Sequence, residues 1–231
     1  MTMGLSTSFD TLVVLDTETT GISMRTDEII ELGAVRYRRE GERYLEEGEL
    51  SFLIQLPTGR TVPPMIERIT GISQAMIDAQ GLGRREAAEQ TSAFLTGEKL
   101  LIAAYNAQFD LSFLYYFLAR FGLADCLRRA KFLDALTVYR DRRPYPHRLE
   151  HAIEAYHLAG AVNSHRAIDD ARATVLLMEA MAAERDDLER YVNLFGYHPK
   201  YGVSGKPIGS VTYCAQPYED HPPLYELVNA K

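Results

Sequence analysis

The sequence has little cysteine and no long hydrophobic run. Its 231 residues include two cysteines, Cys126 and Cys214, which are too few and too far apart for a disulfide framework. No window approaches the roughly 18 apolar residues of a membrane-spanning helix, and the first ten residues, MTMGLSTSFD, lack the basic and apolar regions of a signal peptide. These absences exclude a disulfide-stabilised secreted domain and favour a cytoplasmic protein with no membrane partner.

Internal repeats and low-complexity tracts are also absent, and 46% of the residues are hydrophobic, enough for a sizeable core. Composition changes near residue 185, after which glycines and prolines punctuate the chain and six tyrosines occur. We therefore predict a domain over residues 9–184 and an extended, irregular C-terminal arm over residues 185–231 packed on it. Its tyrosines are expected to be packing anchors rather than base-stacking groups.

The order of the predicted elements indicates an α/β fold. Buried apolar runs predict strands at residues 12–18, 28–37, 51–56, 100–105 and 131–133. Helical spacing of apolar residues predicts helices at 84–96, 110–121, 134–140, 149–157 and 167–183, with Asp134 as an N-cap. A polar turn region around Gly41 and Gly48 separates the second and third strands. Strands first, then strands alternating with helices, predict a mixed β-sheet flanked by helices.

Acidic side chains follow two of these strands and begin the last long helix. Asp16 and Glu18 end the run LVVLDTE and project from one face of the strand, where a divalent cation would offset their repulsion and their cost of burial. Asp110 follows the run LLIAAY, and Asp169 or Asp170 begins the last helix, just after His165. Each has an ordinary alternative explanation, as a polar strand end or a helix-capping acid.

The net charge of −7 at first argues against a nucleic-acid partner. Acids that hold metal ions must be discounted, however, because two divalent cations would cancel the charge of four carboxylates. The charge therefore decides little about the partner.

Three motifs resemble, in order and spacing, those of the DEDDh-type 3′-to-5′ exonucleases, a family that includes the proofreading epsilon subunit of bacterial DNA polymerase III and oligoribonuclease. The first is Asp-x-Glu, here Asp16 and Glu18. The second is Asn-x-x-Phe-Asp, here residues 106–110, and the third is His-x-Ala-x-x-Asp, here residues 165–170. The turn at residues 69–72, ITGI, also resembles a substrate-contacting loop of the epsilon-like branch.

This resemblance implies an RNase H-like fold and two divalent metal ions, Mg²⁺ or Mn²⁺, that serve the hydrolysis of phosphodiester bonds. By motif position, Asp16 should bridge both ions, Glu18 and Asp170 should complete one site, and Asp110 should act through the outer shell of the second. His165 should take the proton of the attacking water, a role suited to imidazole because it titrates near neutral pH. Asp169 is left to cap the helix.

The resemblance also implies a substrate site for a 3′-terminal nucleotide. Main-chain groups near Thr17 and the Glu18 carboxylate should meet the terminal sugar. Phe109 and Ile72 are candidate contacts to bases, Asn106 is a positioning residue, and His165 lies beside the scissile bond. Residues 142–148, with Arg142 and Arg143, are the favoured phosphate-contacting loop.

The function implied is a 3′-to-5′ exonuclease that releases nucleoside 5′-monophosphates from single-stranded DNA ends in proofreading or repair, with a DNA polymerase as a further candidate partner. An RNA-trimming enzyme of the same fold shares every catalytic residue, so the motifs do not separate the two. A nuclease-like module that only binds a partner is the alternative from another class.

Overall fold

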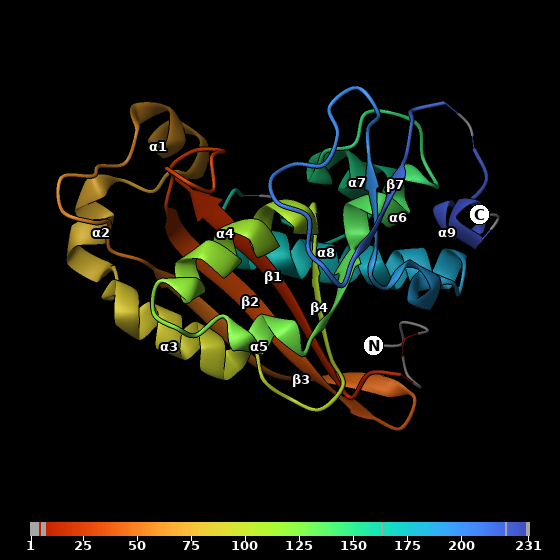
Figure 1. The fold of residues 1–231 in the computed structure, drawn as a ribbon, viewed down its shortest axis with the longest axis horizontal. Helices are drawn as coiled ribbons and strands as arrows, with labels where there is room; N and C mark the ends of the chain where they lie inside the picture. The colour runs from red at the N-terminus through yellow and green to blue at the C-terminus, as the bar shows by residue number, and fades with distance from the viewer. Residues whose placement is uncertain (1–4, 6–7, 163, 220, 230–231) are drawn as a thin grey trace.

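A computed structural model describes residues 5, 8–162, 164–219 and 221–229 of the chain (Figure 1). The expectation that the chain begins without a signal peptide falls largely outside these ranges. Within them, no helix combines the length and the apolar character that crossing a bilayer requires.

The centre of the molecule is a five-stranded mixed sheet in the order β3-β2-β1-β4-β5. β1 pairs antiparallel with β2, and β2 with β3, whereas β1–β4 and β4–β5 are parallel pairs. The strands are β1 Thr11–Thr19, β2 Ile29–Glu40, β3 Arg43–Leu53, β4 Leu100–Ala104 and β5 Lys131–Asp134. The predicted mixed α/β sheet is thus confirmed.

The third strand differs from its predicted position at residues 51–56. β3 begins at Arg43, directly after a tight turn, and Gly48 lies inside it opposite Arg36, next to a bulge. β3 is an edge strand, and most of its residues are exposed to solvent. Because such a strand tolerates charged side chains, its first half lacks the apolar pattern on which the prediction depended.

Helices cover both faces of the sheet (Figure 1). Alternate side chains of β1 enter two separate cores: Leu12 and Val14 pack in the cluster that holds the long helix α8, and Val13 and Leu15 in the cluster that holds α4. The helices are α1 Pro64–Thr70, α2 Gln74–Gln80, α3 Arg84–Phe94, α4 Ala107–Ala119, α5 Asp125–Arg128, α6 Ala135–Arg140, α7 Leu149–Ala155 and α8 Ala167–Glu184. A sheet filled on both faces gives the site below a rigid base.

The C-terminal segment has more regular structure than the sequence indicated. It contains η1 Leu188–Tyr191, β6 Leu194–Tyr197, β7 Thr212–Ala215 and α9 Leu224–Asn229. β6 and β7 form a parallel pair; the apolar run at residues 209–214 predicts a strand that overlaps β7, and no such run marks β6. Tyr191 and Phe195 are almost fully buried in the two cores, whereas Tyr201 and Tyr218 are exposed.

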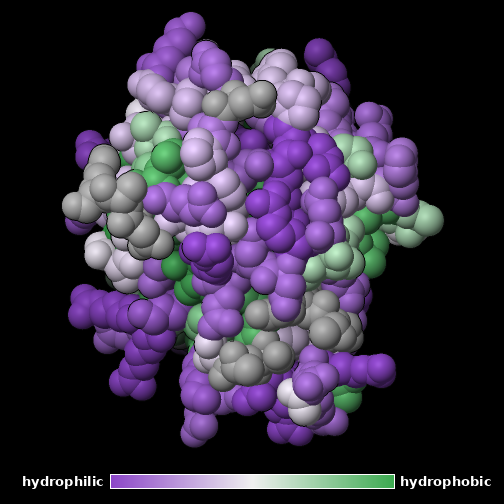
Figure 2. All heavy atoms as spheres, turned by 90° about the vertical axis from the view of Figure 1, so that its right-hand side faces the viewer, coloured by the Kyte–Doolittle hydropathy of each residue, from purple (hydrophilic) through white to green (hydrophobic). Residues whose placement is uncertain are grey.

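The face of the molecule at the right of Figure 1 is mostly hydrophilic, with scattered hydrophobic groups (Figure 2). The division at residue 184 stays a prediction.

Candidate active site

The first two acids of the site lie in the last half of β1. Asp16 and Glu18 are half-buried, and the side chains of Thr17 and Thr19 between and after them are buried. The strand is fully buried up to Leu15, so this alternation begins where the acids begin. As predicted, Asp16 and Glu18 share one face of the strand.

Asp110 is brought to β1 by the parallel pairing of β4 beside it. Its side chain is buried, and Oδ1 accepts hydrogen bonds from the main-chain N–H of Thr17 (3.0 Å) and from the Thr17 hydroxyl (2.7 Å). Asp110 lies in the first turn of α4 rather than at its start, because the helix begins three residues earlier at Ala107. One carboxylate oxygen of Asp110 is therefore committed to β1.

The turn between β4 and α4 depends on another buried acid, Asp134. Asn106 adopts a left-handed backbone conformation with φ of 68°, and its N–H and that of Ala107 donate to Asp134 Oδ1 at 2.9 and 3.0 Å. Asp134 also caps α6, as predicted, by accepting from the N–H of Leu136. Asp134 thus fixes the approach of α4, and with it Asp110, to the site.

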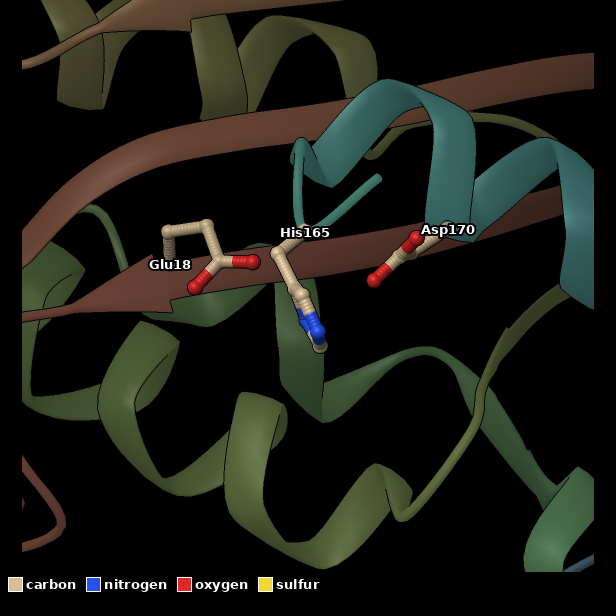
Figure 3. A group of neighbouring side chains, drawn as sticks. All are labelled: Glu18, His165 and Asp170. Carbon is tan, nitrogen blue, oxygen red and sulfur yellow. The ribbon is translucent and has the colours of Figure 1, made fainter. Parts of the chain in front are cut away.

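The last two groups come from the N-terminal end of α8. His165 is exposed and has a φ of 54°, and Asp170 is buried in the first turn of the helix. One ligand atom from each of Glu18, His165 and Asp170 lies within 4.8 Å of the others. Figure 3 shows the three side chains around one space beside β1 and the start of α8. Residues 18 and 165–170 are therefore brought together as the motif order predicted.

The acids of this cluster hold their protons more tightly than isolated carboxyl groups. Burial, followed by the charges of Asp110 and Glu18, raises the pKa of Asp16 well above its usual value. Burial and the charge of Asp170 raise the pKa of Glu18 to about 8. Burial also raises the pKa of Asp110 and of Asp170 to about 7 each. These shifts indicate an excess of negative charge that a bound cation would relieve.

The donor set fits a divalent cation. Carboxylate oxygens are the ligands that hard cations such as Mg²⁺ and Mn²⁺ prefer. Asp170 Oδ1 is buried without a hydrogen-bond partner among the described residues, a costly state for a polar atom that a metal ion would remove. Glu18 and Asp170 are thus the acids placed best to hold an ion in common.

Some predicted substrate contacts are already engaged within the protein. Ile72 is fully buried in a small core cluster with Ile30 and Ile77, so its side chain presents no surface to a base. Phe109 is half-buried and packs on Phe113, with ring centroids 4.8 Å apart. The main-chain N–H of Thr17 donates to Asp110, as described above. Asn106 is exposed beside the site.

Asp169 is not the N-cap of α8 and Arg142 is not a phosphate contact, whereas the rest of the predicted loop, residues 143–148, stays a prediction. The N-cap of α8 is Arg166 and not Asp169, whose carboxylate instead accepts the Ser164 hydroxyl at 2.5 Å. The Arg142 side chain is fully buried and pairs with Asp187, so it is not available to phosphate. The partner of Arg142 lies 45 positions away in the sequence, which a local pattern does not reveal.

Sequence reasoning missed one acid that adjoins the cluster. Glu31 of β2 lies opposite Glu18 in the β1–β2 pairing and is 1% exposed. The available signal was its position inside the apolar run EIIELGAV, because a charged residue in a buried strand requires a partner. That partner, Arg166, is described below.

The fold is shared with RNase H-like exonucleases. The zinc-bound complex of E. coli exonuclease I with single-stranded DNA has a TM-score of 0.67 over 79% of this chain and 42% of that chain, at 22% identity. Product-bound exonuclease I gives 0.63 over 77% and 44%, at 21% identity. The class of fold is therefore the mixed α/β fold of exonuclease I, with a central sheet flanked by helices.

The chain belongs to the Exonuclease family RNase_T, which matches residues 13–178. PolC-type DNA polymerase III of Thermotoga maritima is 34% identical over 168 residues, which cover 71% of this chain and 11% of the polymerase. The 3′-5′ exonuclease DinG of Staphylococcus aureus is 27% identical over 173 residues, 73% of this chain and 18% of DinG. The chain thus spans less than a fifth of these relatives. The resemblance to DEDDh-type exonucleases is confirmed.

Proposed function

We propose that this protein is a metal-dependent 3′-to-5′ exonuclease that acts on single-stranded DNA and releases nucleoside 5′-monophosphates. The observation that carries the proposal is the convergence of Glu18, His165 and Asp170 within 4.8 Å, beside a buried Asp170 oxygen that lacks a partner. DNA is favoured over RNA because the relatives include DNA polymerases and a structure bound to single-stranded DNA.

The four acids would together bind two divalent cations, Mg²⁺ or Mn²⁺. Asp16, whose pKa is raised by burial and by the charges of Asp110, Glu18 and Asp170, would contact both ions, and Glu18 and Asp170 would complete one site. Asp110 would serve the second site through its outer shell, since its Oδ1 is already bonded to Thr17. When bound, the cations supply positive charge that stabilises the attacking and leaving oxygens at phosphorus.

His165 would accept the proton of the attacking water. A general base must reach the attacking water and must then release the accepted proton to solvent. His165 lies beside the acids and is exposed to solvent. Glu18 and the main chain near Thr17 would hold the terminal sugar, and Phe109 and Asn106 would contact or position the last nucleotides. In this reading the acids orient the phosphate and His165 moves the proton.

The test compares short DNA and RNA strands of one sequence, labelled at the 5′ end, with Mg²⁺ or Mn²⁺ and with EDTA. The expected result is a ladder that shortens from the 3′ end, faster on DNA, with 5′-monophosphates as products and no reaction in EDTA. Asp16→Asn is the matched control for a contaminating nuclease. Faster loss of RNA would make the protein an exoribonuclease, and no loss of either strand would leave a binding module.

The proposal extends to a role in proofreading or repair beside a DNA polymerase. PolC-type polymerases contain the matching segment within a much longer chain, of which it covers 11% to 15%. An excess of products from a mismatched 3′ end over a paired one would support proofreading.

A further inference from the structure

An ion pair between a buried acid and a partly exposed arginine adjoins the acid cluster. Glu31 faces Glu18 across the β1–β2 pairing, and its side chain is 1% exposed. Arg166, the residue after His165, donates from Nε and Nη2 to Glu31 Oε1 at 2.9 and 2.6 Å. The pair therefore joins the strand beside Glu18 to the segment that carries His165.

The second oxygen of Glu31 holds the first turn of α8. Oε2 accepts the main-chain N–H of Ala167 at 2.9 Å. The side chain of the N-cap residue, Arg166, does not cap its own helix, so Glu31 supplies that hydrogen bond from a neighbouring strand. Both Glu31 oxygens are thus used within the protein, unlike Asp170 Oδ1, which identifies Glu31 as a support rather than a metal ligand.

Close packing of main-chain atoms also holds the start of α8 against β2. A Cβ added at Gly33 of β2 would lie 2.2 Å from the Ile168 nitrogen and 2.3 Å from the Ala167 carbonyl carbon, so α8 begins directly against the strand. A further hydrogen bond within this segment, from the Ser164 hydroxyl to Asp169, is exposed. Hydrogen bonds to a buried charge are costlier to break than exposed ones, so the Glu31 contacts are the stronger anchor.

We propose that Glu31, acting through Arg166 and the Ala167 N–H, is a positioning residue that sets His165 and Asp170 against Glu18. His165 directly precedes Arg166, and Asp170 follows Ala167 within the same helical turn, so displacement of residues 166–167 moves both groups. A misplacement of about 1 Å can cost about 100-fold in rate. This inference rests on the proposed function, since it concerns the geometry of that site.

The experiment uses Glu31→Gln, Arg166→Met and the double variant in the full chain. We expect kcat on single-stranded DNA to fall about 10- to 100-fold, and the affinity for Mn²⁺, measured by calorimetry without nucleic acid, to fall by about 10-fold or more. KM should stay close to that of the wild type, because neither residue belongs to the proposed substrate contacts. Arg166→Lys, which keeps the charge, should restore part of both losses.

Arg172→Met is the matched control. Arg172 lies on the same helix and is as exposed as Arg166, but its partners Glu46 and Glu49 of β3 are 42% and 52% exposed, whereas Glu31 is 1% exposed. Loss of this pair should leave kcat and Mn²⁺ affinity unchanged. The double variant should be no worse than the poorer single variant, because Glu31 and Arg166 act as one unit.

A purely structural role would lower the melting temperature and leave kcat and Mn²⁺ affinity of the folded fraction at wild-type values, and that result would overturn the inference. If Glu31→Gln does not fold, the two Arg166 variants decide, because they keep the bond from Ala167 to Glu31. If the wild type degrades no nucleic acid, the proposed function fails, and Mn²⁺ binding still tests the positioning role by itself.

Discussion

The carboxylates around the site differ in what already occupies their oxygens. Asp110 gives one oxygen to Thr17, and Glu31 gives both to Arg166 and Ala167. Asp170 keeps a buried oxygen with no partner in the described structure. This difference separates acids that can bind a cation from an acid that supports them, although all carry the same functional group.

Replacing the proposed proton acceptor should stop catalysis without unfolding the protein. For His165→Ala we expect kcat to fall by about 10²- to 10⁴-fold, since a positioned general base contributes about that much. His165 is exposed, so the melting temperature should change little. Asp169→Asn is the control in the neighbouring helical turn and should retain near wild-type activity. A fully active His165→Ala protein would remove this residue from the mechanism.

The raised carboxyl pKa values predict that the metal-free protein loses stability as pH rises. Between the ordinary carboxyl pKa, about 4, and the folded-state values of about 7 to 8 for Asp110, Asp170 and Glu18, the folded state binds more protons than the unfolded state. The melting temperature in EDTA should therefore fall from pH 5 to pH 8.5, and Mn²⁺ should restore more stability at the upper pH than at the lower.

Glu18→Gln isolates this effect, because the variant keeps every other titrating group. Its melting temperature in EDTA should decline less with pH than that of the wild type, and its gain from Mn²⁺ at pH 8.5 should be smaller. Parallel curves for the two proteins would contradict the assignment of the shift to this cluster.

At the scale of single residues, the sequence predicted the groups that local context identifies. Asp16 and Glu18 lie at the end of an apolar strand, and Asp170 follows His165 at the sequence spacing of the motif. Glu31 was missed because its partners, Arg166 and Ala167, are 135 and 136 positions away, and its importance depends on those contacts.

Among the elements, the sheet determines where the acids meet. β4 lies parallel to β1, so the turn after β4 opens at the same edge at which β1 presents Asp16 and Glu18. α8 then crosses β1 and β2 with its first turn at that edge (Figure 1). Apolar periodicity predicted these elements well. It failed for β3, where solvent exposure removes the apolar signal.

The ion pair between the end of α6 and the segment after α8 should be structural. The Arg142 side chain is fully buried, bonds to the main-chain oxygen of Met181 and pairs with buried Asp187. Arg142→Met should lower the free energy of unfolding by about 3 to 5 kcal/mol, because buried Asp187 loses its closest ion pair and keeps a longer one with Arg185. Urea titration followed by circular dichroism measures the loss.

Arg143→Met provides the comparison at the adjacent residue. Arg143 pairs with Glu184 at the surface, where both side chains are about one-third exposed, so its loss should cost less than about 1 kcal/mol. Equal losses for the two variants would show that burial does not distinguish these ion pairs.

At the scale of the whole molecule, hydrogen bonds join the C-terminal segment to the core domain. The loop before β7 is bonded to α4, because Gln108 Nε2 donates to the carbonyl oxygens of Ser204 and Lys206 at 2.8 and 3.1 Å. Gln108 lies two residues before Asp110. The sequence predicted that this segment packs on the domain, but its contacts join residues about a hundred positions apart, which no local pattern records.

Removing one apolar anchor of this segment should destabilise the whole protein. Phe195 of β6 is 1% exposed and packs in the same core as Val13 and Leu114. Phe195→Ala should cost about 3 to 5 kcal/mol, as large-to-small changes in packed cores do. Tyr201→Ala, at a 70% exposed tyrosine of the same segment, is the control and should have little effect. A normal midpoint in urea for Phe195→Ala would show that the segment contributes little to the core.

The ion pair of Glu31 and Arg166 has a consequence for protein synthesis. Chains emerge from the ribosome with the amino terminus first, so β1 and β2 leave the exit tunnel long before the arginine that neutralises Glu31. Until that arginine arrives, the strand pair carries an unmatched charge, and the nascent chain has neither His165 nor Asp170. A nascent chain that has not yet exposed these residues therefore lacks part of the proposed catalytic site.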